Sequence, residues 1–247
     1  MFNSNYSIQA QNLCKKFRTD RTRITMFELL KRRLFGTYHN SNRFTLENIN
    51  ISVIKGETIG IIGNNGSGKT TFLKLIAGLY KPNSGKVIVN GKLTLLGGLG
   101  IGMLDEITVQ ENVFLYGSIF GLEREKIKEN LLEIVEWAGL RDFIRADLKT
   151  LSSGMRSRLA FSTIRHVETD IFLLDEALSA GDRNFKEKCH QYFKSSKDNG
   201  KTFLIATHDL EFAKMFCDKT LWLHKGNQKD FGETERVLKS YEEFNSK

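Results

Sequence analysis

Features that define several common protein classes are missing from this sequence of 247 residues. Its cysteines, Cys14, Cys189 and Cys217, are odd in number and form no Cys-x-x-Cys pair, which predicts reduced core thiols in a cytosolic protein. No apolar run approaches the roughly 18 residues that a membrane span needs. The opening stretch MFNSNYSIQAQN is too polar for a signal peptide, and neither an internal repeat nor a low-complexity tail is present.

Charge is present in ordinary amounts but is unevenly distributed. The formal net charge is +8, and the segment from Lys15 to Arg43 contains nine Lys or Arg against two acids, Asp20 and Glu28. The rest of the chain is therefore almost neutral. A basic patch this local indicates an acidic partner or a membrane surface, with an ordinary solvated face as the alternative.

Hydrophobic periodicity predicts an α/β fold with a mostly parallel sheet, because strand and helix patterns alternate from residue 170 onward. From about 108 to 166 the period is helical, and this block interrupts the core as an inserted helical subdomain within a single domain, 1–247. Strands are expected at 6–10, 44–54, 58–63, 86–91, 92–98, 171–174, 202–207 and 220–224, and helices at 69–79, after Asp182 and at 209–216.

The stretch GNNGSGKT fits the pattern G-x-x-x-x-G-K-[ST] between a predicted strand and a predicted helix. Its glycines let backbone N–H groups wrap phosphates, Lys69 can reach the β- and γ-phosphates, and the Thr70 hydroxyl can ligate Mg²⁺. The pattern therefore predicts a phosphate-binding loop for a nucleoside triphosphate. The residues expected to contact the nucleotide are Gly63, Asn64, Asn65, Gly66, Ser67, Gly68, Lys69, Thr70 and Thr71.

Two predicted core strands end in ionisable residues. IFLLDE is a buried strand that ends in Asp175, which can hold the Mg²⁺ ion, and Glu176, which can deprotonate an attacking water. LIATHD ends another strand at His208, which can hydrogen-bond the γ-phosphate. We therefore expect Lys69, Glu176 and His208 to be catalytic. Taken alone, the acidic pair could be a helix cap, and the histidine could be a structural residue.

The stretch LSSGMRSRLA, residues 151–160, places small residues at a predicted helix start, where uncovered N–H groups attract anions. With the other motifs in this order, the chain resembles the ATP-binding-cassette (ABC) ATPases, whose Leu-Ser-Gly-Gly-Gln signature is matched by Leu151 to Met155. The resemblance implies a P-loop ABC ATPase core with an N-terminal antiparallel β region. It also implies a homodimer, in which Ser152, Ser153 and Gly154 contact the γ-phosphate of ATP bound to the other subunit.

The same resemblance suggests an aromatic residue that stacks on adenine. Phe17 matches the family position, and Phe44 and Tyr38 are alternatives because the intervening segment is long. The family also has a Gln near position 97 that senses Mg²⁺, but this chain has Gly97. Which group completes the shell of the ion is left open, and water is one candidate.

Further details resemble the polysaccharide-exporting branch of the family, namely Ser-Ser-Gly-Met in the signature and Gly181-Asp182 followed by Phe185 to Cys189. The resemblance implies ATP hydrolysis coupled to export of a lipid-linked O-antigen, capsule or teichoic chain. It also implies two copies of a separate multi-span permease, at the cytoplasmic face of the inner membrane. An amphipathic helix within the basic insertion, about 18–43, is expected to contact the anionic membrane surface and the permease. The alternative is that its apolar stripe packs on the protein's own core.

Other functions fit the sequence less well. A different ABC exporter or importer subunit is one alternative, and a soluble ABC ATPase acting on nucleic acid is another. Such soluble proteins usually carry two cassettes or coiled-coil insertions, and this chain has one cassette and no heptad run, so no nucleic-acid partner is expected. NQKD (227–230) has the wrong order for a guanine-binding motif, and LLGGLGIGML lacks the third glycine of a dinucleotide loop.

Overall fold

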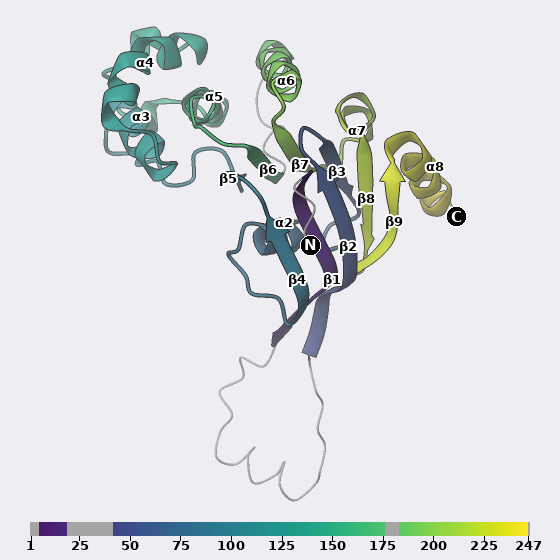
Figure 1. The fold of residues 1–247 in the computed structure, drawn as a ribbon. Helices are drawn as coiled ribbons and strands as arrows, with labels where there is room; N and C mark the ends of the chain where they lie inside the picture. The colour runs from purple at the N-terminus through teal and green to yellow at the C-terminus, as the bar shows by residue number, and fades with distance from the viewer. Residues whose placement is uncertain (1–4, 19–41, 176–182, 247) are drawn as a thin grey trace, which may run out of the picture.

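A computed structural model describes residues 5–18, 42–175 and 183–246 (Figure 1). Within these residues, the strands form one nine-stranded sheet in the order β4-β1-β2-β9-β8-β3-β7-β6-β5. The strands are β1 (Tyr6–Arg18), β2 (Asn42–Ile54), β3 (Thr58–Ile62), β4 (Ser84–Val89), β5 (Leu93–Leu96), β6 (Ile171–Asp175), β7 (Thr202–Ala206), β8 (Lys219–His224) and β9 (Asn227–Glu233).

Strand direction divides the sheet into two regions. Strands β5, β6, β7, β3 and β8 are parallel to one another, so their C-terminal ends meet at one edge of the sheet. At the other side, β1 is antiparallel to both β2 and β4. The predicted α/β class, with a mostly parallel sheet and an N-terminal antiparallel region, is therefore confirmed.

The central strands are apolar on both faces, as parallel strands covered on both sides must be. In β6, Leu173 faces one apolar cluster together with the helix α2 residues, and Leu174 faces a second cluster together with α6 residues. The helices are α2 (Lys69–Ile76), α3 (Val109–Ile119), α4 (Arg124–Trp137), α5 (Ser153–Ile164), α6 (Arg183–Asp198), α7 (Leu210–Phe216) and α8 (Thr234–Asn245), with 3-10 turns at Arg141–Phe143 and Leu148–Thr150.

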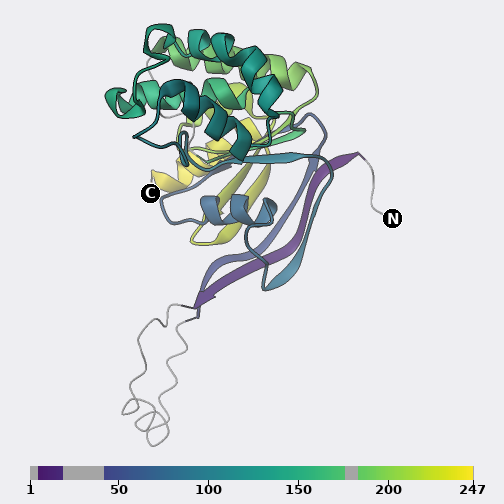
Figure 2. The same ribbon diagram turned by 90° about the vertical axis from the view of Figure 1, so that its left-hand side faces the viewer.

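Helices α3, α4 and α5 lie within residues 108–166 and pack mainly on one another (Figures 1 and 2). Helix α3 begins with a capping box, in which the Thr108 hydroxyl accepts from the Glu111 backbone and the Glu111 carboxylate accepts from the Thr108 backbone. None of the described helices is long and apolar enough to cross a membrane. The basic insertion, 18–43, lies outside the described residues except at its two ends.

Several element boundaries differ from the sequence-based expectation. Strand β1 continues to Arg18, because the irregular residues near Asn12 (φ 47°) shift the register but do not end the pairing. Helix α2 ends at Ile76 rather than near 79, because Gly78 (φ 72°) takes the left-handed conformation and closes the last turn. Strand β9 and helix α8 were not expected at all.

All three cysteines are free thiols, as predicted. Cys189 and Cys217 are buried, and burial raises the pKa of both thiols to about 12. Cys14 is half-buried, and its Sγ accepts a hydrogen bond from the backbone N–H of Asn48 at 3.2 Å. The two buried thiols therefore act as packing groups, because thiols with such high pKa values stay protonated near neutral pH.

An aromatic cluster centred on Phe161 joins the helical block to the core. The Phe161 ring lies 5.7 Å from that of Trp137 on α4, 5.8 Å from that of Phe185 on α6 and 5.5 Å from that of Phe193 on α6. Phe161 is only 2% exposed. One side chain on α5 thus contacts rings from two other helices, and its packing links the signature helix to the sheet through α6.

We expect Phe161→Ala to lower the free energy of unfolding by about 3–5 kcal/mol, the usual cost of emptying a buried phenylalanine site. The measurement is equilibrium unfolding in urea. Phe143→Ala is the matched control, because Phe143 is 39% exposed, and it should cost less than about 1 kcal/mol. Equal losses in the two variants would contradict the central place of Phe161.

Candidate functional site

Most of the reactive residues predicted from the sequence lie at the edge of the sheet where the parallel strands end. The phosphate-binding loop (Gly63–Thr70) follows β3, Asp175 is the last residue of β6, and His208 follows β7 by two positions. Strand β7 lies between β3 and β6, and Asp175 is in register with Ala206, the last residue of β7. The topology therefore brings these three groups together. Glu176, the next residue after Asp175, lies outside the described residues.

Glycine is required at two positions of the phosphate-binding loop. Gly63 (φ 144°) and Gly68 (φ 109°) have backbone conformations that other residues rarely adopt. A Cβ atom on Gly63 would lie 2.1 Å from the Leu223 carbonyl oxygen, and one on Gly68 would lie 2.6 Å from the Leu46 side chain. The loop is therefore packed against β8 at its start and against β2 at its end.

The interior of this loop carries groups suited to an anion. Lys69 is 6% exposed, and its Nζ donates to the carbonyl oxygens of Gly63 (2.8 Å) and Asn64 (3.4 Å). The buried Ser67 hydroxyl has no hydrogen-bond partner within the described residues. At Gly68, helix α2 begins without a side-chain cap, so its first N–H groups are available as well. An orphan hydroxyl, a held ammonium group and an uncapped helix end together fit a phosphate chain.

The oxygen donors for a cation are few. Thr70 is exposed on the first turn of α2, and Asp175 is half-buried at the end of β6. Among the described residues, no three His, Cys, Asp or Glu side chains are grouped as an all-protein metal site. A hydroxyl and a carboxylate fit Mg²⁺, which usually takes one or two protein ligands and completes its shell with phosphate oxygens and water.

A hydrogen-bonded turn after β7 presents His208 at the same edge. The Thr207 N–H donates to the Ile61 carbonyl oxygen at 3.1 Å, and the Thr207 hydroxyl accepts from the Asp209 N–H at 3.0 Å. Asp209 in turn caps helix α7. His208 itself is exposed. The turn is thus tied to β3, the strand that leads into the phosphate-binding loop.

The signature segment lies in a different part of the molecule. Ser152 caps α5, and its hydroxyl accepts from the Met155 N–H at 3.2 Å. Ser153 is exposed, and a Cβ atom on Gly154 would meet no described atom within 4 Å. Figures 1 and 2 both show α5 in the helical block, apart from α2. The start of α5, at Ser153 and Gly154, is therefore accessible to another molecule. Met155 packs against the apolar cluster of the helical block.

The aromatic candidates for adenine are only partly described. Phe17 lies on β1, with its ring centroid 5.3 Å from that of Tyr80 and 5.0 Å from the Lys15 Nζ. Tyr38 and the side chain of Phe44 lie outside the described residues. Stacking of adenine on Phe17 stays a prediction. Tyr80 was not singled out in the sequence, because no motif contains it.

Two further polar residues with structural hydrogen bonds were not singled out in the sequence. Asn112 is fully buried on α3 and holds the loop before it, accepting from the Leu104 N–H at 2.8 Å and donating to the Leu104 carbonyl at 2.9 Å. Tyr241 on α8 donates from its hydroxyl to Asn64 Oδ1 of the phosphate-binding loop at 3.1 Å. The signal for α8 was the apolar spacing in ERVLKSYEEF, whereas nothing in the sequence pairs Tyr241 with Asn64.

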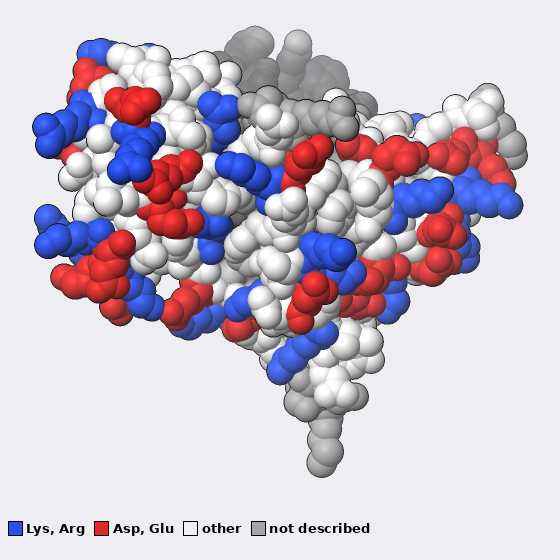
Figure 3. Space-filling model, turned by 90° about the horizontal axis from the view of Figure 1, so that it is seen from above, with Lys and Arg blue, Asp and Glu red and all other residues white. Residues whose placement is uncertain are grey.

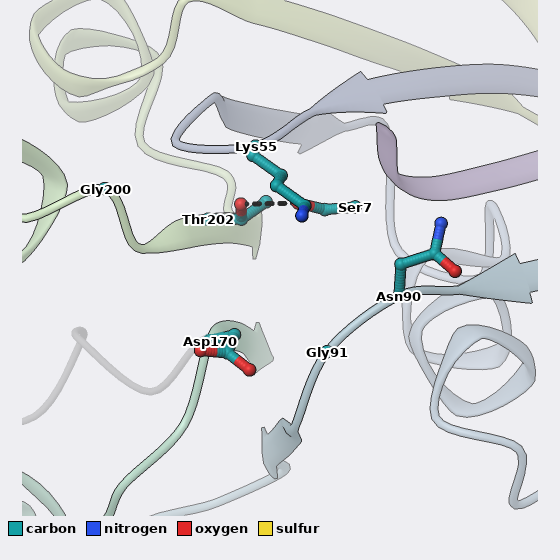
Figure 4. Close-up of a pocket in the computed structure, with 7 residues that line it drawn as sticks. All are labelled: Ser7, Lys55, Asn90, Gly91, Asp170, Gly200 and Thr202. Atoms are coloured by element: carbon teal, nitrogen blue, oxygen red, sulfur yellow. Dashed lines mark hydrogen bonds between the residues drawn. The ribbon is translucent and has the colours of Figure 1, made fainter. Parts of the chain in front are cut away.

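A polar hollow of about 500 Å³ lies at the opposite edge of the sheet, where β6 and β7 begin (Figure 4). Several of the polar side chains that line it already have hydrogen-bond partners in the protein. The hydroxyls of Ser7 and Thr202 are 2.9 Å apart, and Asp170 Oδ2 accepts from the Lys92 N–H at 2.8 Å. The hollow is therefore separate from the phosphate-binding loop, which follows the C-terminal end of β3.

Charges of both signs are interspersed over the described part of the face that carries the helical block (Figure 3). Exposed ion pairs on or beside this block include Lys126 with Glu168 and Arg141 with Glu136. Such pairs contribute little to stability, because solvent screens them. The face drawn in Figure 3 has no single-sign field over its described residues.

Comparisons with known proteins point to one family. The family model described as "ABC transporter" matches residues 46–179. The teichoic acids export ATP-binding protein TagH of Bacillus anthracis is 38% identical over 97% of this chain and 43% of its own length. The O-antigen export system ATP-binding protein RfbB of Klebsiella pneumoniae is 35% identical over 88% of this chain and 85% of its own length. The chain thus spans less than half the length of that TagH.

Solved structures show the same fold. The ATP binding subunit of an ABC transporter superposes with a TM-score of 0.74 at 21% identity, covering 95% of this chain and 92% of the other. A dimeric ATP-binding cassette in a post-hydrolysis state, bound to ADP and phosphate, gives a TM-score of 0.71 at 24% identity, covering 92% and 98%. The family model, the relatives and the phosphate-binding loop agree, and the chain belongs to the ABC transporter family.

Proposed function

We propose that this chain is the ATP-hydrolysing subunit of an ABC transporter that exports a lipid-linked polysaccharide. The observation that carries the ATPase part is the convergence of the phosphate-binding loop, Asp175 and His208 at the ends of three adjacent parallel strands. The substrate class is supported by the relatives, which are named for export of teichoic acids and O-antigen. Which polysaccharide is exported, whether O-antigen, capsule or teichoic chain, is a property of the whole transporter rather than of this subunit alone.

In this proposal the chain's own residues divide the work along the strand ends. Lys69 and the N–H groups of the loop hold the β- and γ-phosphates, and the Ser67 hydroxyl gains the partner that it lacks in the described residues. Thr70 and Asp175 hold Mg²⁺, which neutralises the developing charge on the phosphate oxygens. Glu176 accepts the proton of the attacking water, and His208 donates a hydrogen bond to the γ-phosphate.

The complete site requires a second copy of the chain. The open N-terminus of α5, with Ser152, Ser153 and Gly154, contacts the γ-phosphate on the partner's phosphate-binding loop. Exposure of Ser153 and the free space around Gly154 support this arrangement. The helical block, 108–166, acts in it as a subdomain that presents the signature to the other subunit.

The transporter further needs two copies of a separate multi-span permease, and the dimer binds it at the cytoplasmic face of the inner membrane. The basic insertion, 18–43, most of which lies outside the described residues, contacts the anionic lipid surface through its Lys and Arg side chains. Its local charge supports this role, because basic residues near such a surface each contribute about 1 kcal/mol.

Glu176→Gln tests the turnover step. The variant should bind ATP as the unaltered chain does, yet hydrolyse it at least about 100-fold more slowly, because a positioned general base contributes that much. Phosphate release and nucleotide binding are measured on the same preparation. Glu129→Gln, at an exposed position on α4, is the control and should leave both unchanged. Hydrolysis by Glu176→Gln near the normal rate would show that another group is the base.

Gly154→Asp tests the two-copy site. The added carboxylate would face the γ-phosphate across the interface, so each monomer should still bind ATP while ATP-dependent dimerisation is lost. Sedimentation in the Glu176→Gln background measures the dimer. Ser118→Asp, which adds the same charge at an exposed position on α3 of the helical block, should dimerise normally. ATP hydrolysis at full specific rate on extreme dilution would rule out a composite site.

Charge reversal at Lys31, Arg32 and Arg33 tests the membrane contact. The triple Glu variant should keep its ATPase activity and lose co-sedimentation with anionic vesicles, since each lysine or arginine near such a surface contributes about 1 kcal/mol. The control carries the same charge change at exposed lysines, namely Lys128, Lys214 and Lys239. Unchanged vesicle binding by the Lys31 triple variant, or loss of its folding, would contradict a membrane-facing role.

A further inference from the structure

Helix α8 reaches across to the phosphate-binding loop. Its Tyr241 hydroxyl donates a hydrogen bond to Asn64 Oδ1 at 3.1 Å, over a separation of 177 residues along the chain. Asn64 is the second residue of the loop and is exposed, whereas Tyr241 is half-buried. Among the described residues α8 is the last helix, and this contact connects it to the first residues of the phosphate-binding loop, directly after β3.

The tyrosine is fixed in place by an apolar cluster that also holds the start of the loop. Its ring makes an edge-to-face contact with Trp222 at 5.4 Å. Tyr241 packs against a cluster of four buried residues, Ile62, Trp222, Val237 and Leu238. Ile62 is the last residue of β3 and directly precedes Gly63. Tyr241 therefore packs on the same cluster that contains Ile62, the residue directly before the loop.

The turn between β8 and β9 holds the same loop from another side. The Gly226 N–H donates to the Ser67 carbonyl oxygen at 3.1 Å. The Leu223 carbonyl oxygen lies so close to Gly63 that a Cβ atom there would be 2.1 Å from it. The loop therefore packs against β8, the turn between β8 and β9, and α8. Among these contacts, the Tyr241 hydroxyl makes the hydrogen bond to a side chain of the loop.

The loop residue that Tyr241 contacts, Asn64, also accepts a hydrogen bond from the Lys69 ammonium group through its backbone carbonyl oxygen. Lys69 Nζ donates to the carbonyl oxygens of Gly63 and Asn64, at 2.8 and 3.4 Å. A displacement of Asn64 would therefore move one of the two carbonyl groups that hold the cation. Fixing the Asn64 side chain keeps the ammonium group and the loop N–H groups in one arrangement before any ligand arrives.

We propose that Tyr241 is a positioning residue for the phosphate-binding loop, which it orders in advance through Asn64. Ordering a loop before binding removes an entropic cost that the ligand would otherwise meet. The proposal rests on the proposed function, in which this loop holds the triphosphate of ATP. It adds that nucleotide affinity depends on a contact from α8, an element that carries no motif residue.

Tyr241→Phe isolates the hydroxyl, because the ring and its packing on Trp222 are retained. The dissociation constants of ATP and of inorganic tripolyphosphate should rise about three- to tenfold, the factor that one hydrogen bond of ordinary net strength supplies. The KM for ATP should rise by a similar factor, while kcat stays the same. The urea midpoint should fall no further than it does in Tyr192→Phe, because each variant removes one tyrosine hydroxyl and the apolar cluster is untouched.

Two further variants separate positioning from general destabilisation. Tyr192→Phe is the matched control, because it removes a half-buried tyrosine hydroxyl that donates to the Arg165 carbonyl oxygen at 3.2 Å, outside the loop. It should leave nucleotide affinity unchanged. Asn64→Ala removes the acceptor, and in that background Tyr241→Phe should have no additional effect on affinity, since two partners of one bond are not additive.

The outcomes distinguish the positioning role of Tyr241 from the proposed function of the phosphate-binding loop, on which that role depends. ATP binding by Lys69→Ala that equals that of the unaltered chain would overturn the assignment of the loop itself. If Lys69→Ala loses binding but Tyr241→Phe binds normally, the positioning role is wrong and the loop assignment stands. Full additivity of Asn64→Ala and Tyr241→Phe would also overturn the positioning role, as would equal losses of affinity in Tyr241→Phe and Tyr192→Phe.

Discussion

The parallel pairing of β3, β7 and β6 is the constraint on which the site depends. Parallel strands end together, so residues that follow each strand in the sequence become neighbours at one edge. The register that sets Asp175 beside Ala206 also sets the turn of His208 beside the end of β6. These strands can lie inside the sheet because α2 covers one face and α6 the other, which requires apolar side chains on both. The parallel pairing of these strands therefore determines both the packing of the core and the geometry of the site.

The phosphate-binding loop needs support from segments that are distant in the sequence. Its glycines permit unusual backbone angles but give no rigidity of their own. Rigidity comes from close packing of Gly63 on Leu223 and of Gly68 on Leu46, and from the Gly226 N–H. Helix α8 adds a hydrogen bond to a loop side chain. Binding of an anion and stability of the hairpin that carries Leu223 and Gly226 are thus coupled through one set of contacts.

The parts that could be predicted from the sequence are those with a local cause. The phosphate-binding loop could be predicted because its pattern has fixed spacing over eight consecutive residues, Gly63 to Thr70. Strand β6 could be predicted because IFLL is apolar throughout. The contact between Tyr241 and Asn64 could not be predicted, because it depends on how α8 packs on Trp222. The same holds for Asn112, whose partners are backbone groups of a loop with no pattern. The end of α2 depended on one glycine conformation that competes with helix periodicity.

A crystal structure of the chain with ATP and Mg²⁺ tests the central claim most directly. The account predicts phosphates against the N–H groups of the Gly63–Thr70 loop, with Thr70 and Asp175 on the ion and Ser153 and Gly154 of a second copy on the γ-phosphate. Nucleotide bound at the opposite edge, in the hollow beside Asp170 and Thr202, would contradict it. So would a nucleotide held by one copy alone, with the N-terminus of α5 facing solvent.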